Sequence, residues 1–253
     1  LPRGYVFVVA DTLVKAAKTA EALDKYNRRP IECRLAVAVL CRRLAERLGR
    51  AVPAERLGDL AQPAVGLSPS QLLSDVRQAL HPAPYSLEEI ARILGSSPAE
   101  TARAYCLRRD GSVFPQPTDG FKLQARCLHV LEEGRRVEDF LVALRSGEVS
   151  RLGDLMDRSH ESCRDLYEIS CPELDRLTDI AREAGAEGSR LTGAGFGGCT
   201  ISLVREERLP EFLAAVTRRY YREHRRGGPP DLSSALFACR AVDGAGVLSR
   251  GGR

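Results

Sequence analysis

The sequence predicts an α+β fold in which helices pack on an antiparallel sheet. Short segments with strand patterns lie near both ends of the chain, at residues 5–12, 199–204 and 235–242, and the first of them is apolar and rich in β-branched residues. Helical patterns fill most of the long stretch between them, and no internal repeat is present. Because the strands are separated from the helices along the chain, we expect them to pair antiparallel rather than to form βαβ units.

The composition is that of an ordinary globular protein. The 253 residues are 43% hydrophobic and 28% charged, which excludes a disordered chain, a collagen and a coiled-coil rod. No apolar run approaches the roughly 20 residues that span a bilayer, so no membrane protein is expected. A net charge of +4 is too small to indicate nucleic-acid binding. The eight cysteines form no C-x-x-C pair and are interpreted as reduced thiols, which predicts a cytoplasmic protein.

The first strand is expected at residues 5–12 (YVFVVADT), and the first helix at residues 30–48. Pro30 fits the first turn of this helix and Gly49 lies just past its end. Tyr26 then falls at a junction between loop and helix, next to several charged residues. Two interpretations remain open for this junction: polar side chains converging on a sugar or a phosphate, or an ordinary solvated first turn.

Three short helices in the middle of the chain have clear starts. Each begins with a serine followed three residues later by Gln or Glu, which is the capping-box pattern: Ser68 with Gln71, Ser86 with Glu89, and Ser97 with Glu100. Gly95 is placed to end the second of them. We therefore expect a group of short helices after the irregular segment 50–66.

The second half of the chain is expected to begin with one long amphipathic helix at residues 121–144, ended by Gly147, and a second helix at residues 151–167. Ser170 with Glu173 forms a fourth capping box, with Pro172 in the first turn that follows. A last helix opens at Pro210 and runs through Tyr220. The strand at 235–242 then closes the pattern.

The loop at residues 193–198 is the sharpest candidate for a functional site. Its four glycines, Gly193, Gly195, Gly197 and Gly198, leave the backbone unshielded, so N–H groups can approach an anion or substrate closely. A helix is expected before the loop and a strand after it, which is the reverse of the dinucleotide-binding order, and the Walker ending is absent. The alternative is a tight hairpin with a purely structural role.

Other reactive residues give weaker signals. His160 with Cys163, and His129 with Cys127, lack a second ligand pair at zinc-site spacing, so no metal site is expected. No Ser–His–Asp arrangement and no nucleophile elbow are present. The three capped helices at residues 69–105, followed by Arg108 and Arg109, also allow an interaction module that resembles a helix-turn-helix.

Longer segments resemble a known family. SRLTGAGFGGCTISLV (189–204) resembles the third signature motif of the GHMP small-molecule kinases, and SHESCRDLYEISCPELDRL (159–177) resembles the galactokinase branch of that family. FKLQARCLHVLEE (121–133) and YNRRPIECRLA (26–36) look like the same branch. ALHPAPYSLEEIARILG (79–95) is more similar to N-acetylgalactosamine kinase. The resemblance extends over essentially the whole chain.

The resemblance implies the C-terminal lobe of such an enzyme. Residues 1–20 would be a strand and linker that belong with an N-terminal lobe, and residues 21–253 the C-terminal domain, with a helical insert at about 50–118. The family's sugar-signature motif, its serine-rich phosphate loop and the Asp taken as catalytic base do not occur in this sequence. The resemblance therefore places no catalytic residue and no metal ligand in this chain.

The resemblance does assign binding residues. Tyr26 matches the aromatic position that contacts the sugar ring, and Asp11 with Thr12 matches an Asn-Ser pair associated with the nucleotide. Asp11 departs from that pattern, because it places an anion near phosphates. The third motif would form the active-site glycine loop, Gly193, Ala194, Gly195, Phe196, Gly197 and Gly198.

The implied reaction is phosphoryl transfer from ATP with Mg²⁺ to the anomeric hydroxyl of galactose or N-acetylgalactosamine, by a cytoplasmic and monomeric enzyme. ATP and Mg²⁺ are expected for the full-length enzyme only, and the chain alone is expected to be inactive. Its partners would be the sugar and ATP, without nucleic acid or membrane. The alternatives are an inactive regulator that senses sugar and ATP on the same scaffold, and the interaction module described above.

Overall fold

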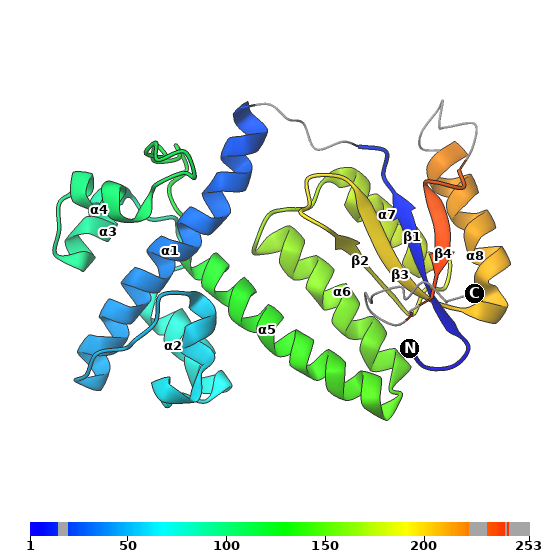
Figure 1. The fold of residues 1–253 in the computed structure, drawn as a ribbon, viewed down its shortest axis with the longest axis horizontal. Coiled ribbons are helices and arrows are strands. Elements are labelled where there is room, and N and C mark those ends of the chain that lie inside the picture. Colours follow the sequence, from blue (N-terminus) through cyan, green and yellow to red (C-terminus); the bar gives the residue numbers. More distant parts are fainter. Residues whose placement is uncertain (15–19, 223–231, 241, 243–253) are drawn as a thin grey trace, which may run out of the picture. The chain divides into compact units, whose positions relative to one another are not determined.

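The fold was obtained as a computed structural model that describes residues 1–14, 20–222, 232–240 and 242 (Figure 1). The chain divides into two compact units. The sheet unit comprises residues 1–14, 142–157 and 171–253, and the helical unit comprises residues 15–141 and 158–170. Two long helices, α5 (Leu123–Ser146) and α6 (Val149–Asp165), each have residues in both units.

The sheet unit is built on four antiparallel strands in the order β2-β3-β1-β4. Their bounds are β1 (Tyr5–Asp11), β2 (Gly188–Thr192), β3 (Cys199–Arg205) and β4 (Leu236–Cys239). The first strand therefore lies inside the sheet, paired with β3 on one side and β4 on the other. The predicted antiparallel α+β architecture is confirmed. The assignment of residues 1–20 to a further lobe is not tested by this pairing and stays a prediction.

One face of the sheet carries the core of this unit. Val6, Val8 and Ala10 alternate as buried residues along β1, the strand that the apolar, β-branched run at residues 5–12 predicted. Val8 and Ala10 belong to a cluster with residues of α7 (Pro172–Glu183) and α8 (Leu209–Val216), among them Leu177, Ile180 and Phe212. Helices α7 and α8 thus pack on the same sheet and hold its central strand.

The helical unit is formed around α1 (Ala20–Leu48), which packs against a series of short helices (Figure 1). These are η1 (Leu57–Ala61), η2 (Pro63–Val65), α2 (Pro69–Ala79), α3 (Leu87–Leu94) and α4 (Pro98–Tyr105). One apolar cluster joins them to the start of α5, with Leu35, Leu40, Leu72, Ile90 and Phe121 in its interior. Among the described helices, none has the length and apolar character needed to cross a bilayer.

The capping predictions for the short helices hold in the structure. The hydroxyls of Ser68, Ser86 and Ser97 accept hydrogen bonds from the third helical backbone N–H of α2, α3 and α4. The box is complete at Ser97, where the Glu100 carboxylate also accepts from the Ser97 N–H. Gly95 ends α3 with φ of 71°. The fourth predicted box is wrong, because α7 starts after Cys171, which makes no side-chain cap.

Three other element predictions need correction. Helix α1 begins at Ala20 rather than Pro30, so Pro30 lies inside the helix. Strand β2 was missed, because Gly188–Thr192 is short and begins with small and polar residues. The last α-helix is also shorter than predicted, because α8 ends at Val216. It is preceded by the short η3 (Glu206–Arg208) and followed by a π-helical turn, η4 (Thr217–Arg222).

A buried histidine in the helical unit makes its stability depend on pH. His129 is 7% exposed, its Nδ1 lies 2.9 Å from the Ser162 hydroxyl, and its ring stacks on Tyr167 with 4.3 Å between centroids. Burial lowers the pKa of His129 to about 4, from 6.5. The folded protein therefore favours neutral His129, while the unfolded chain takes up a proton below about pH 6.5.

We expect the His129 contribution to stability to be fully present above about pH 6.5 and to be lost progressively down to about pH 4, by about 3 kcal/mol. Urea unfolding of the wild-type protein and of His129→Gln across this range measures it. In the variant, the free energy of unfolding should depend less on pH. A variant His81→Gln, at a half-exposed position, serves as the control. Equal pH slopes for wild type and His129→Gln would contradict the prediction.

Candidate functional site

Two segments from opposite ends of the sequence meet at one end of the sheet. Residues 193–198 connect β2 to β3 as a hairpin loop, so a strand rather than a helix precedes it, and that part of the prediction is wrong. The other segment, residues 11–14, leaves the end of β1. Asp11 lies directly opposite Cys199, the first residue of β3 after the loop.

Thr12 ties the two segments together. Its backbone N–H donates to the Gly198 carbonyl at 2.9 Å, and its hydroxyl donates to the same oxygen at 2.7 Å. The Gly198 N–H in turn donates to the Val14 carbonyl at 3.0 Å. Thr12 is completely buried. The structure therefore brings the predicted pair Asp11–Thr12 and the glycine loop into one site, in which the Thr12 hydroxyl supports the loop.

The turn at residues 11–14 is locally strained. Leu13 has φ of 59°, a left-handed conformation that a branched side chain rarely adopts. Side-chain acceptors stabilise the turn from within: Asp11 Oδ1 accepts from the Leu13 N–H at 2.8 Å, and the Thr12 hydroxyl accepts from the Val14 N–H at 3.2 Å. Such conformations persist where surrounding contacts fix them, and they cluster at functional sites.

The loop itself is almost entirely left-handed. Gly193, Gly195, Gly197 and Gly198 have φ values of 85°, 80°, 131° and 79°, and Phe196 has 60°. At Gly197 a Cβ atom would collide with the Val14 carbonyl oxygen, so only glycine fits against the 11–14 turn. At Gly193 the corresponding space is open. The glycines therefore serve both the fold of the hairpin and the exposure of bare backbone at its tip.

The titratable groups beside the loop limit its chemistry. Burial and the nearby Asp11 carboxylate raise the pKa of the Cys199 thiol, which keeps it protonated near neutral pH. Cys199 is therefore unsuited to act as a nucleophile. The bare backbone of the loop and the Asp11 carboxylate, which the Leu13 N–H engages, are suited to positioning a ligand rather than to covalent catalysis.

Tyr26 belongs to the other unit of the chain. It is a half-buried residue of α1 in the helical unit, whereas the glycine loop belongs to the sheet unit. The sequence had predicted Tyr26 at a junction between loop and helix, and this prediction is wrong, because Tyr26 lies within α1. Pro30, one turn further on, has no N–H to donate to the Tyr26 carbonyl, a feature that marks this turn of α1 as irregular.

The charged neighbours of Tyr26 do not form a solvated first turn. Glu32 and Arg126 are both completely buried, and the Arg126 Nε lies 2.6 Å from Glu32 Oε2. The other Glu32 oxygen accepts from the Arg28 Nε at 2.9 Å and from the Lys122 N–H at 3.1 Å. Arg29 donates to the Tyr167 and Glu168 carbonyls. These residues therefore form an internal ion network.

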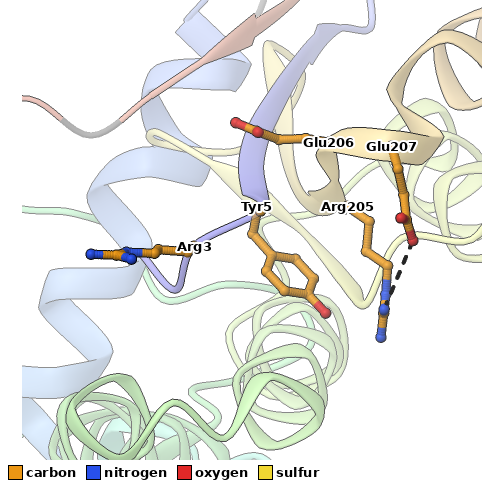
Figure 2. A pocket seen from close by; sticks show the side chains of 6 residues that line it. Arg3, Tyr5, Arg205, Glu206 and Glu207 are labelled. Atoms are coloured by element: carbon orange, nitrogen blue, oxygen red, sulfur yellow. Dashed lines mark ion pairs between the residues drawn. The ribbon is translucent and has the colours of Figure 1, made fainter.

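Two hollows of the surface have none of the candidate residues in their linings. One, of about 370 Å³, is lined by Tyr5 and Arg205 with Arg3, Gly4, Glu206 and Glu207 (Figure 2). Tyr5 and Arg205 pair at the end of β1 and β3 opposite to the glycine loop. The other, of about 610 Å³, lies in the helical unit against Pro30, Cys33 and Tyr167. Over the described residues, no three His, Cys, Asp or Glu side chains gather where they would hold a metal ion.

Two side chains to which the sequence assigned no role contact the 11–14 turn. Tyr220 and Tyr221 come from the π-helical turn η4, and their hydroxyls lie near the Thr12 and Asp11 carbonyls. Local pattern identifies them only as buried aromatic residues, since a contact across more than 200 residues leaves no periodic signal in the sequence.

The comparisons with known proteins agree with one another. Residues 140–222 match the family described as GHMP kinases C terminal. The galactokinase of Dictyostelium discoideum is 35% identical over 247 residues, which cover 87% of this chain and 46% of that protein. Human galactokinase is 36% identical over 181 residues, covering 69% of this chain and 42% of that protein.

A solved structure gives the same picture. Lactococcus lactis galactokinase, complexed with galactose, superposes with a TM-score of 0.58 and 26% sequence identity, over 87% of this chain and 42% of that chain. The chain therefore spans less than half the length of each of these relatives.

Proposed function

The chain contains a GHMP kinase C-terminal domain and has galactokinases among its homologues, and from this premise we propose that it is the C-terminal part of a sugar-1-kinase. The reaction is transfer of the γ-phosphoryl group of ATP to the anomeric hydroxyl of galactose. The hydroxyl oxygen forms the new bond to phosphorus, the bond from phosphorus to the bridging oxygen of ADP breaks, and a base receives the hydroxyl proton.

The observation that carries this proposal is the junction of the glycine loop with the 11–14 turn. The Thr12 contacts with Gly198 fix the loop on the end of β1, and at Gly193 no atom lies within 4 Å of the place where a Cβ would be. Phosphoryl transfer depends mainly on positioning and on stabilising phosphate charge, which are tasks that a rigid, unshielded backbone can perform. The proposal assigns residues 193–198 to the floor of the phosphate site.

Asp11 and Thr12 would lie at the nucleotide side of this site. The Thr12 side chain acts indirectly, because it is buried and bonded to the loop. The Asp11 carboxylate accepts from the Leu13 N–H, which disperses part of its charge near the phosphates. No Mg²⁺ ligand is assigned to the described residues of this chain, since they hold no suitable cluster, and no step is derived through the metal ion.

Tyr26 is proposed to contact the sugar. An aromatic side chain offers an apolar face to a sugar ring and a hydroxyl for hydrogen bonding. The names of the relatives favour galactose as the substrate. N-acetylgalactosamine remains a second substrate of the same proposal, suggested by residues 79–95, which resemble N-acetylgalactosamine kinase. A cytoplasmic and monomeric enzyme stays the prediction made from the sequence.

The test compares the isolated chain with the longer enzyme proposed to contain it. We expect the 253-residue chain alone to form no ADP with ATP, Mg²⁺ and either sugar, because its sequence lacks the serine-rich phosphate loop and the segment with the catalytic Asp. The longer enzyme should release ADP and sugar 1-phosphate with galactose, and the ratio of kcat/KM for the two sugars assigns the substrate.

Two outcomes would contradict the proposal. Turnover by the isolated chain would show that the missing segments are dispensable. A longer protein that binds galactose and ATP without forming a sugar 1-phosphate would instead support the sensing regulator. The helix-turn-helix alternative gains no support from the homologues, and Arg108 pairs with Asp24 at 2.9 Å instead of remaining available for a phosphate backbone.

A further inference from the structure

Besides the hydrogen bonds within the turn and those to Gly198, two adjacent tyrosines also hold the 11–14 turn. The Tyr220 hydroxyl donates to the Thr12 carbonyl at 3.1 Å. The Tyr221 hydroxyl lies 2.7 Å from the Asp11 carbonyl oxygen and 3.0 Å from the Ala235 carbonyl oxygen, so its one proton is shared between them. Both rings are almost completely buried and meet edge to face, with 5.1 Å between centroids.

The local backbone explains how two neighbouring residues reach the same turn. On an α-helix, adjacent side chains point about 100° apart and do not serve one target. Tyr220 and Tyr221 lie in η4, a π-helical turn, where the wider backbone changes these directions. Single π-helical turns are rare and occur frequently at functional sites.

Strain in the two segments provides a second, independent observation. Among the described residues, only Leu13, Glu168 and Phe196 are non-glycine residues with positive φ. Two of these three, Leu13 and Phe196, lie in the paired segments of the site. A strained turn keeps its conformation only when outside contacts fix it. The tyrosine hydroxyls supply such contacts on one side of the turn, and the Thr12 contacts with Gly198 supply them on the other.

We propose that Tyr220 and Tyr221 are positioning residues of the phosphoryl-transfer site, which hold the 11–14 turn and, through Thr12, the glycine loop 193–198. The inference rests on the function proposed above. Neither hydroxyl needs to touch a ligand: both act through the backbone carbonyls of the pair assigned to the nucleotide side. Loss of a hydroxyl should therefore loosen the loop and weaken nucleotide binding, while contacts to the sugar remain unchanged.

The first experiment measures amide hydrogen exchange in the 253-residue chain with Tyr220→Phe, Tyr221→Phe and the double variant. Each change removes one oxygen atom and keeps the ring. We expect the Thr12 and Gly198 amides to exchange about tenfold faster for each lost hydroxyl, and the Val8 amide in the middle of β1 to be unaffected. Tyr105→Phe in the helical unit is the control, because within the described part of the chain the Tyr105 hydroxyl makes no hydrogen bond.

The second experiment uses the longer enzyme. The KM for ATP should rise about five- to tenfold in each variant, with the KM for the sugar unchanged. Faster exchange of the Thr12 and Gly198 amides without any change in the kinetics would make the tyrosines merely structural and would overturn the proposal. Exchange rates of these amides in the Tyr220 and Tyr221 variants that equal those in Tyr105→Phe would overturn it as well. If the unmodified enzyme phosphorylates no sugar, the proposed function fails, and the exchange experiment still decides whether the tyrosines hold the loop.

Discussion

Replacement of Arg126 by Met should lower the free energy of unfolding by about 3–5 kcal/mol, the largest stability effect expected for a single side chain in the helical unit. Arg126 is completely buried and donates from three nitrogens: Nε to Glu32 at 2.6 Å, Nη2 to Glu168 at 2.6 Å and Nη1 to the Leu166 carbonyl. It thereby connects α1, α5 and the segment that follows α6.

The loss of stability in Arg126→Met comes mainly from the buried acceptors that remain without their donor. Without Arg126, the completely buried Glu32 carboxylate loses its shortest ion pair and keeps the Arg28 Nε and the Lys122 N–H as donors, with the Arg29 guanidinium further away at 3.9 Å. A buried charge that loses its partner costs far more than the intact pair contributes, because desolvation is no longer offset. The Leu166 carbonyl loses its Arg126 donor at the same time.

Urea unfolding of Arg126→Met measures this effect, and Arg42→Met provides the matched control. Arg42 also pairs with a glutamate, Glu46, at 2.9 Å, but both side chains are about half exposed. An exposed pair of this kind contributes about 0.5 kcal/mol or less. A loss below about 1 kcal/mol for Arg126→Met would show that the network is not a stabilising centre of this unit.

The Gly197→Ala variant of the longer enzyme should lose activity by about 100-fold or more, since it displaces the loop from the 11–14 turn. The new Cβ would collide with the Val14 carbonyl oxygen, and the backbone φ of 131° is one that L-residues rarely adopt. The hydrogen bond from the Gly198 N–H to the same oxygen would be strained as well. We also expect the free energy of unfolding to fall by about 2–3 kcal/mol.

Gly193→Ala in the same loop separates the effect of the collision with Val14 from the cost of placing alanine in a left-handed backbone conformation. Its φ of 85° is also left-handed, but the space where a Cβ would lie is open. The expected loss of stability is about 1 kcal/mol, from conformation alone. Steady-state kinetics and urea unfolding of both variants make the comparison. Equal losses of activity for Gly193→Ala and Gly197→Ala would show that the contact with Val14 is unimportant.

The short-range features of this protein were predictable because they depend on neighbouring residues. The apolar, β-branched run at residues 5–12 identified β1, and the serines at 68, 86 and 97 located three helix starts. The glycine loop also followed from sequence, since four glycines in six residues need positive φ or close approach. The resemblance to GHMP kinases rested on such contiguous segments.

Helix α1 shows where local rules failed. Pro30 is favourable in a first turn and costly in a helix interior, so the sequence placed the helix start there. In the structure the helix extends to Ala20, and long-range contacts surround the turn before Pro30: Arg28 donates to the Gly120 carbonyl and Arg29 to the Tyr167 carbonyl. Tertiary contacts outweighed a local propensity.

The sequence by itself determined three of the four strands, the caps of the three short helices and the glycine loop, because each depends on interactions within a few residues. Only the tertiary structure decided that Thr12 supports that loop, that Tyr220 and Tyr221 hold the same turn, and that Glu32 and Arg126 are a buried pair. These contacts join residues 94 to 210 positions apart. Their formation depends on how the whole chain closes on itself, which no local pattern encodes.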